Sequence, residues 1–176
     1  ASIGILSLTS STKVEVNCKK PTGALCYVIP QTNPTHRNEN TPVFLTMASP
    51  VMGVKNINIL VKQDASSLKC SNVSFSSAFL AQCASSNIDT TIPGQIRLLA
   101  QLKNSMVITN PVTFASYTIR AFGNAPYNGY LLNVDTASRM LTQNGQLIDA
   151  QLGAMVLSVL PTDAAAPDIN CGSFIV

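Results

Sequence analysis

The chain has 176 residues, of which 46% are hydrophobic and only 11% are charged, with a formal net charge of +3. A chain of this length buries about two-thirds of its unfolded surface on folding, so a packed domain is expected. The small net charge argues against nucleic-acid binding, and the densest basic group, Lys13, Lys19 and Lys20, is interpreted as a solvated face rather than a phosphate site. Because few like charges keep neighbouring copies apart, this composition favours association.

Cysteine content and the lack of long apolar runs indicate the compartment. Five cysteines without zinc-ligand spacing are typical of an oxidising environment. No apolar run reaches the roughly 18 residues that a membrane-spanning helix needs. A first residue of Ala1 is what signal-peptidase cleavage leaves in a mature secreted chain. We therefore expect a secreted or cell-surface protein that folds as a single domain, residues 1–176, without a membrane span.

The first residues form an apolar segment, whose large side chains are Ile3, Ile5, Leu6 and Leu8. A free N-terminus is usually frayed, so an apolar one is expected to pair with a sheet. Residues 1–9 are predicted to be either an edge strand of this domain or a strand exchanged with a neighbouring subunit by β-augmentation.

A hairpin is predicted after this segment. Polar and apolar residues alternate over residues 13–18, and Pro-Thr-Gly at residues 21–23 fits a three-residue loop. A hairpin centred on Thr22 places Cys18 opposite Cys26, at a Cα separation that a disulfide can bridge. The alternative is a pair of reduced cysteines in the core.

The next region is predicted to be a polar loop followed by two strands. Pro30–Pro42 lacks large apolar side chains and is expected to be a loop. Val43–Met47 is predicted to be a short strand. A second strand is expected within Val51–Lys62, where apolar and polar residues alternate from Ile57 onward.

A short helix is predicted at Ser74–Ala84. One or two turns would direct Phe75 and Phe79 inward, although the many serines of this segment are weak helix formers. Cys70 and Cys83 bracket the segment and are predicted to form a disulfide across it.

The most regular pattern lies at Gln95–Lys103, where every even position is apolar and most odd positions are polar. This period of two is typical of a strand with one buried face, and the turn dipeptide Pro93-Gly94 marks its start. Lys103–Ser105 is interpreted as a break before a short return strand, Met106–Thr109. A third strand then carries Tyr117 on its apolar face. The region therefore predicts a three-stranded antiparallel meander.

The last third of the chain is predicted to hold two strands and a second short helix. Tyr130–Val134 and Ala154–Leu160 are the strands. The helix is expected at Ala137–Gln143, with Asp135 or the residue after it as the cap and Asn144-Gly145 at its end. About nine or ten short strands with little helix predict an all-β fold, either an antiparallel β-sandwich or a jelly-roll-like Greek key with one or two short helices.

No residue pattern typical of an active site is present. The only histidine, His36, lies in a polar loop, whereas a catalytic base needs a dry pocket and a third group to orient it. The two glutamates, Glu15 and Glu39, and the six aspartates show no spacing typical of a carboxylate pair or a calcium loop. We expect no catalytic residue, metal or cofactor. A hydrolase whose carboxylates are brought together only by the fold is the alternative.

Loop residues with aromatic or basic side chains are the candidate ligand-binding groups. His36 and Arg37 lie in the Pro30–Pro42 loop, and Tyr127 and Tyr130 flank an Asn-Gly turn. The alternative for the tyrosines is structural packing.

Two further residues, Asn72 and Cys171, are candidates for covalent modification or cross-linking. Asn72 begins an Asn-Val-Ser sequon, which is a glycosylation acceptor in a eukaryotic secretory pathway. Because the number of cysteines is odd, at least one has no partner within the chain. Cys171 is predicted to be that cysteine, either buried or bridged to another chain.

The apolar segment of residues 3–8 and the stretch APYNGYLLNV at Ala125–Val134 resemble bacterial fimbrial subunits. That resemblance implies secretion, cysteine bridges and polymerisation by an N-terminal donor strand, although Asp135–Val176 extends beyond the fimbrial pattern. The predicted function is a non-enzymatic subunit of an extracellular filament, pilus-like or adhesive assembly, with copies of itself as partner. The alternatives are a loop-based binding protein or toxin-like effector, a capsid subunit and a hydrolase.

Overall fold

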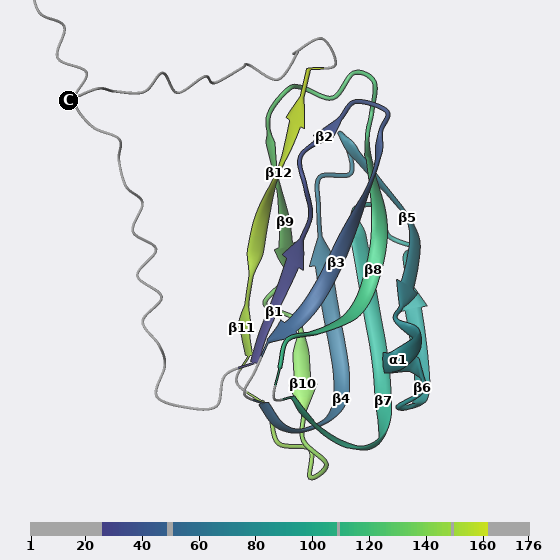
Figure 1. The fold of residues 1–176 in the computed structure, drawn as a ribbon, viewed down its shortest axis with the longest axis vertical. Coiled ribbons are helices and arrows are strands. Elements are labelled where there is room, and N and C mark those ends of the chain that lie inside the picture. Colours follow the sequence, from purple (N-terminus) through teal and green to yellow (C-terminus); the bar gives the residue numbers. More distant parts are fainter. Residues whose placement is uncertain (1–25, 49–50, 109, 149, 162–176) are drawn as a thin grey trace, which may run out of the picture.

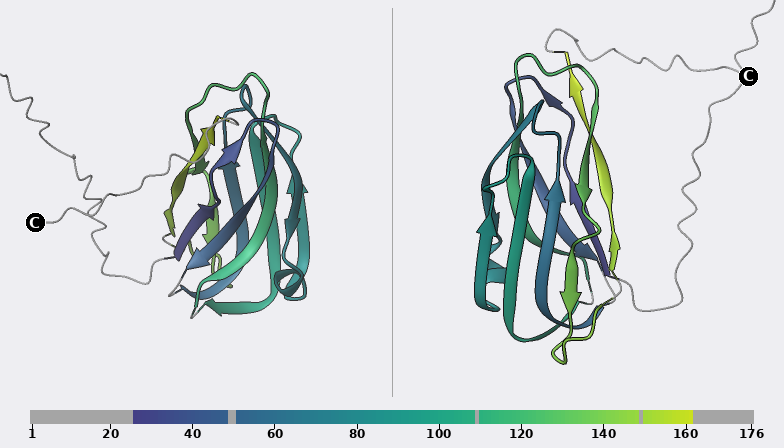
Figure 2. Two further views of the ribbon diagram at one scale, coloured as in Figure 1. Left: turned by 45° about the horizontal axis from the view of Figure 1, so that its top comes forward. Right: turned by 180° about the vertical axis from the view of Figure 1, so that it is seen from behind.

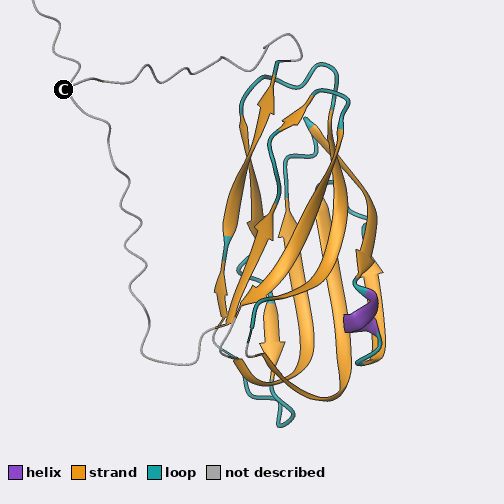
Figure 3. Cartoon of the chain, viewed as in Figure 1, coloured by secondary structure: helices purple, strands orange, loops and turns teal. Residues whose placement is uncertain are grey.

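The computed structural model describes residues 26–48, 51–108, 110–148 and 150–161. This part of the chain is a β-sandwich of two sheets, with a single turn of helix at one edge (Figure 1, Figure 3). In chain order the elements are β1 (Cys26–Gln31), β2 (Thr35–His36), β3 (Asn40–Ala48), β4 (Val51–Lys62), β5 (Leu68–Phe75), α1 (Ser77–Leu80), β6 (Cys83–Asp89), β7 (Gln95–Ile108), β8 (Val112–Ala121), β9 (Gly129–Val134), β10 (Arg139–Leu141), β11 (Ala150–Leu152) and β12 (Ala154–Leu160).

Strand pairing defines the two sheets. A five-stranded sheet has the order β11-β1-β3-β8-β5, and a seven-stranded sheet has the order β2-β12-β9-β4-β7-β6 with β10 paired to β4. Neighbouring strands are antiparallel except for the pairs β1–β11 and β2–β12. The two sheets stack face to face in every view (Figure 2). The predicted all-β sandwich is confirmed.

The core lies between the inward faces of the two sheets. In β7, Ile96, Leu98, Ala100 and Leu102 are all at most 6% exposed, and in β8 Tyr117 is 2% exposed. Because side chains alternate across a strand, the same residues that made the sequence periodic face the opposite sheet. The predicted buried faces of both strands are therefore confirmed.

One departure from alternation occurs in β8, where Phe114 and Ala115 are consecutive and both buried. The pairing with β3 explains it, because Leu45 faces Ala115 whereas Thr46 faces Thr113. Phe114 is thus an extra residue in a β-bulge, and a bulge re-aims one side chain relative to its neighbours. Here it directs a large ring into the core.

The predicted meander is wrong. β7 is one strand of 14 residues, and it pairs with β4 and β6, whereas β8 lies in the opposite sheet. Lys103–Ser105 is exposed and the ladder is irregular there, yet pairing with β4 resumes at Met106. The polar triplet is an irregularity within a strand rather than a turn, because backbone pairing does not require buried side chains.

The short helix α1 forms within the predicted segment Ser74–Ala84. The Ser76 hydroxyl caps it by accepting a hydrogen bond from the backbone N–H of Phe79 at 3.3 Å. Phe79 is 1% exposed, so the helix carries an aromatic ring into the core from the edge between β5 and β6 (Figure 1).

The predicted Cys70–Cys83 disulfide is also wrong, because both thiols are free in the structure. Cys70 lies near the start of β5 and Cys83 begins β6, and these strands run in opposite directions on either side of α1 (Figure 1). The two residues therefore lie toward opposite ends of the sandwich. Desolvation raises the pKa of both thiols, which keeps them protonated and weakly nucleophilic.

Three predicted features lie outside the described residues. They are the N-terminal strand of residues 1–9, the hairpin centred on Thr22 that carries Cys18, and the last segment with Cys171. The Cys18–Cys26 disulfide and the exchanged strand consequently stay predictions.

Candidate functional site

The outer face of the seven-stranded sheet carries a groove of about 510 Å³ over β10, β4, β7 and β6. No described helix covers this face (Figure 2, right). The strand register arranges the lining side chains in two rows that cross all four strands. The first row is Leu141, Asn56, Gln101 and Ser85. The second row is Arg139, Asn58, Leu99 and Asn87.

Alternation along the strands explains why these side chains point outward. In β4, Ile57 and Ile59 are at most 2% exposed and face the core, so Asn56 and Asn58 between and beside them face the groove. Residues directly opposite on neighbouring strands have Cβ atoms roughly 5 Å apart. Each row is therefore a continuous line of neighbouring side chains across the four strands.

The groove combines an apolar centre with amides that have unused hydrogen-bonding capacity. Leu99 is half-buried in the second row. The side chains of Asn56, Asn58 and Gln101 make no hydrogen bond with a described residue. Because each amide offers two donors and a carbonyl acceptor, the surface can pair with either kind of group on a binding partner.

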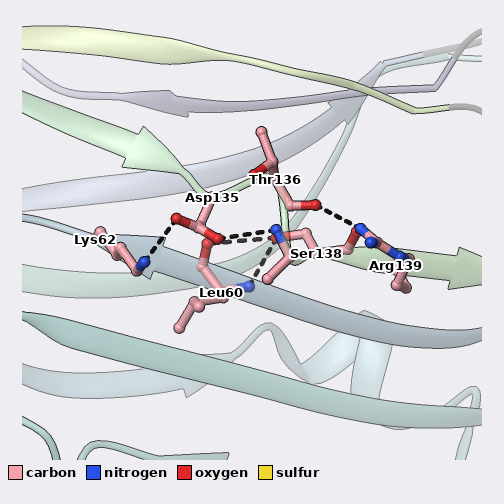
Figure 4. Close-up of polar contacts among 7 residues, drawn as sticks. Leu60, Lys62, Asp135, Thr136, Ser138 and Arg139 are labelled. Atoms are coloured by element: carbon pink, nitrogen blue, oxygen red, sulfur yellow. Dashed lines mark hydrogen bonds and ion pairs between the residues drawn. The ribbon is translucent and has the colours of Figure 1, made fainter.

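A turn between β9 and β10 precedes Arg139, which lines this groove (Figure 4). The Asp135 carboxylate accepts a hydrogen bond from the N–H of Ala137 at 2.8 Å and pairs with Lys62 Nζ at 2.8 Å. The N–H of Ser138 donates to the Asp135 carbonyl at 2.9 Å. These contacts close a tight turn, and β10 follows it. The predicted helix Ala137–Gln143 is therefore wrong.

Ser138 fastens this turn to β4 and thereby positions Arg139. Ser138 is 5% exposed. Its hydroxyl accepts a hydrogen bond from the N–H of Leu60 at 2.9 Å. The Arg139 guanidinium donates through Nη1 to the carbonyls of Thr136 and Ser138 (Figure 4). The guanidinium is thus held at the rim of the groove, and its Nε and Nη2 make no hydrogen bond to a described residue.

The Asp135 ion pair makes stability depend on pH. The hydrogen bond from Lys62, followed by that from the N–H of Ala137, lowers the pKa of Asp135. A carboxyl whose pKa is lower in the folded state stabilises the fold above its unfolded pKa and loses that contribution as pH falls through the folded pKa. We expect the free energy of unfolding to decline below about pH 5, and Asp135→Asn to make the decline shallower. Urea unfolding at a series of pH values measures this, and an identical decline in the variant would contradict it.

Two of the ligand-binding residues predicted from the sequence meet at the end of the sandwich where β2 lies (top of Figure 1). The Arg37 guanidinium lies 3.7 Å from the centre of the Tyr127 ring, and its Nε donates to the Ala125 carbonyl at 2.6 Å. Nδ1 of His36 lies 3.2 Å from the Leu160 carbonyl, at the end of β12. A ligand role for these side chains stays a prediction.

Tyr130 does not belong to this group. It is 8% exposed, and its hydroxyl donates to the Pro126 carbonyl at 2.8 Å. The alternative of structural packing therefore applies to Tyr130, which packs into the core from β9 and is not exposed for ligand binding. Tyr127, at 49% exposed, remains available at the surface.

The groove residues were not predicted from the sequence, although a signal for them was present. Leu99 and Leu60 are apolar residues on the otherwise polar outward faces of β7 and β4. Single apolar residues are common at protein surfaces, so the surroundings of each one decide its role. Leu60 is 5% exposed beside the Asp135–Ser138 turn, whereas Leu99 lies in the open groove.

Within the described part of the chain, no cluster of three or more His, Cys, Asp and Glu side chains is placed to bind a metal ion. Among the same residues, no helix is both long enough and apolar enough to span a membrane.

Comparison with known proteins finds similar structures but no sequence family. No family model and no curated protein matches the sequence. A cohesin from Clostridium acetobutylicum is 19% identical, with a TM-score of 0.62 over 76% of this chain and 91% of that one. The sixth cohesin of Acetivibrio cellulolyticus scaffoldin B, solved with a Cel5 dockerin, is 14% identical, with a TM-score of 0.60 over 78% and 100%. A non-cellulosomal cohesin from Archaeoglobus fulgidus is 13% identical, with a TM-score of 0.63 over 78% and 92%. The chain has a cohesin-like β-sandwich fold.

Proposed function

We propose that this chain is a secreted, non-catalytic module that binds a partner protein through the groove over β10, β4, β7 and β6. The observation that carries the proposal is the pair of side-chain rows, in which amides without described partners surround Leu99 on an uncovered sheet face. An apolar centre with a polar rim is the usual anatomy of a protein–protein interface. Cohesins of the same fold have been solved in complex with dockerins, which supports a protein as the partner.

The shape of the site favours a protein over a small molecule. The lining comes from four adjacent strands and lies on the outside of the sandwich rather than between its sheets. Small-molecule sites bury most of the ligand surface in a cleft, whereas an open sheet face matches a partner with a complementary surface of its own.

The test uses Leu99→Lys, with Thr118→Lys as the matched control on the outer face of the opposite sheet. The tagged chain is incubated with secreted proteins of the source organism, and a captured protein is purified and titrated by calorimetry. We expect this protein to bind the wild type and Thr118→Lys equally, and to bind Leu99→Lys at least about tenfold more weakly, because a charge at the centre of an interface disrupts a hot spot. Unchanged binding to Leu99→Lys, or a loss confined to Thr118→Lys, would contradict the proposal.

Self-association is the second candidate function. β5 and β6 each end a sheet and have one unpaired edge, to which the apolar residues 3–8 of another copy can add as a strand. Size-exclusion chromatography with light scattering compares the full chain with a version lacking residues 1–9. Multimers that become monomers on truncation would support a filament subunit, and monomers in both cases would count against it.

A further inference from the structure

The lining of the groove contains one positive charge and no described carboxylate. Arg139 lines it, and Lys55 and Lys103 follow its first row along β4 and β7. A row of amides with three cations at its border has a net positive field, which a binding partner must complement.

The three cations are held in place by backbone carbonyls. Lys55 Nζ donates to the Lys103 carbonyl at 2.7 Å, and Lys103 Nζ donates to the Ala81 carbonyl at 2.9 Å. Arg139 Nη1 donates to the Ser138 carbonyl at 2.7 Å. These bonds restrict the side chains without neutralising their charge.

Two described carboxylates of this sheet and its connections, Asp135 and Asp89, are engaged by other residues. Asp135 pairs with Lys62 at 2.8 Å, the one ion pair within the described ranges. Asp89 accepts hydrogen bonds from the N–H and hydroxyl of Thr91 at 2.9 and 2.7 Å, and it lies opposite Arg97 on β7. Each of these carboxylates therefore faces a cation that is not part of the groove lining, Lys62 for Asp135 and Arg97 for Asp89.

A partner that covers the groove removes water from these charges. An unpaired charge buried at an interface is costly, whereas an arginine paired with a carboxylate forms two parallel charge-assisted hydrogen bonds. The free Nε and Nη2 of Arg139 are the donors that such a pair needs. A basic partner would instead bring like charges together.

We propose that the segment occupying this groove is an acidic protein segment, with one carboxylate on Arg139, a second beside Lys55 and Lys103, and an apolar side chain on Leu99. The inference rests on the proposed function and specifies the chemistry of the partner at the same site.

The test is a selection of random displayed peptides on the full chain. Selections run in parallel on the wild type, on Arg139→Glu, and on Lys69→Glu as a charge-reversal control on the opposite sheet. Peptides recovered from the wild type are synthesised and titrated by fluorescence anisotropy against each variant and Arg139→Gln, with thermal unfolding as the check that each variant is folded.

We expect a surplus of Asp and Glu in the wild-type pool and of Lys and Arg in the Arg139→Glu pool. Affinity should fall at least about tenfold for Arg139→Glu, less for Arg139→Gln, and with rising salt, while Lys69→Glu binds like the wild type.

The outcomes separate this inference from the proposed function. Peptides that require Leu99 but carry no acidic surplus, or that bind Arg139→Glu as tightly as the wild type, would overturn the acidic partner and leave the binding groove standing. Peptides that bind Leu99→Lys as tightly as the wild type would overturn the groove itself and the inference with it.

Discussion

Replacing Phe79 by alanine is expected to lower the free energy of unfolding by about 3–5 kcal/mol. Phe79 is 1% exposed, and its ring centre lies 5.5 Å from that of Phe75 and 5.7 Å from that of Phe114. The helix that carries this ring has only one turn, which is not stable by itself. The ring therefore both fills the core and holds α1 against it. Urea unfolding measures the change, as a shift in midpoint at constant slope.

The next residue of the same helix supplies the control. Leu80 is 42% exposed, so Leu80→Ala is expected to cost less than about 1 kcal/mol. Both variants place alanine in α1 and change its helix propensity little. A difference between them isolates the buried ring of Phe79, and equal losses would contradict its role as the anchor.

The inward faces of the strands were predictable because they depend only on local alternation. Burial of one face imposes a period of two on any strand, whichever strands it pairs with. Local alternation does not determine which strands pair with each other. Nothing in Gln95–Lys103 distinguishes pairing with the next strand along the chain from the observed pairing with β4 and β6. Lys103–Ser105 was interpreted as a turn for lack of that non-local information.

The turn signal Asn144-Gly145 is a turn in the structure, but the elements on either side of it differ from those predicted. Asn144-Gly145 was predicted to end a helix, and it instead forms a tight turn in which the N–H of Gly145 donates to the Thr142 carbonyl at 3.1 Å. The bridge between Leu141 and Leu147 makes it the turn of a hairpin-like return. A glycine with positive φ serves both purposes, and only the pairing of β10 with β4 decides between them.

The groove was beyond prediction for the same reason. Its rows combine residues of β4, β6, β7 and β10, which are far apart in sequence, and a shift of one residue in any register would turn that strand's contribution into the core. The local signal was confined to Leu99, an apolar residue among outward polar ones. Its neighbours in space, Asn58 and Arg139, become known only with the sheet order.

Gly94→Ala is expected to destabilise the fold by about 2–5 kcal/mol, from strain and overpacking together. Gly94 has φ +75° in the turn that starts β7, where the N–H of Gln95 donates to the Ile92 carbonyl at 3.0 Å. A β-carbon at this position would lie 2.6 Å from the carbonyl oxygen of Gln63. Since the N–H of Gln63 donates to the Gly94 carbonyl at 2.9 Å, the two backbones cannot separate without losing that bond.

Gly145→Ala separates the two causes of this loss. Gly145 has the same φ of +75°, but a β-carbon there would meet nothing within 4 Å. Its substitution should therefore cost only the left-handed conformation, about 1–2 kcal/mol. Urea unfolding of both variants measures the loss of unfolding free energy in each. The difference between the two losses is the cost of placing a methyl group between Gly94 and Gln63. Equal losses would show that backbone conformation alone requires glycine at both turns, and that the contact between the start of β7 and the end of β4 tolerates a methyl group.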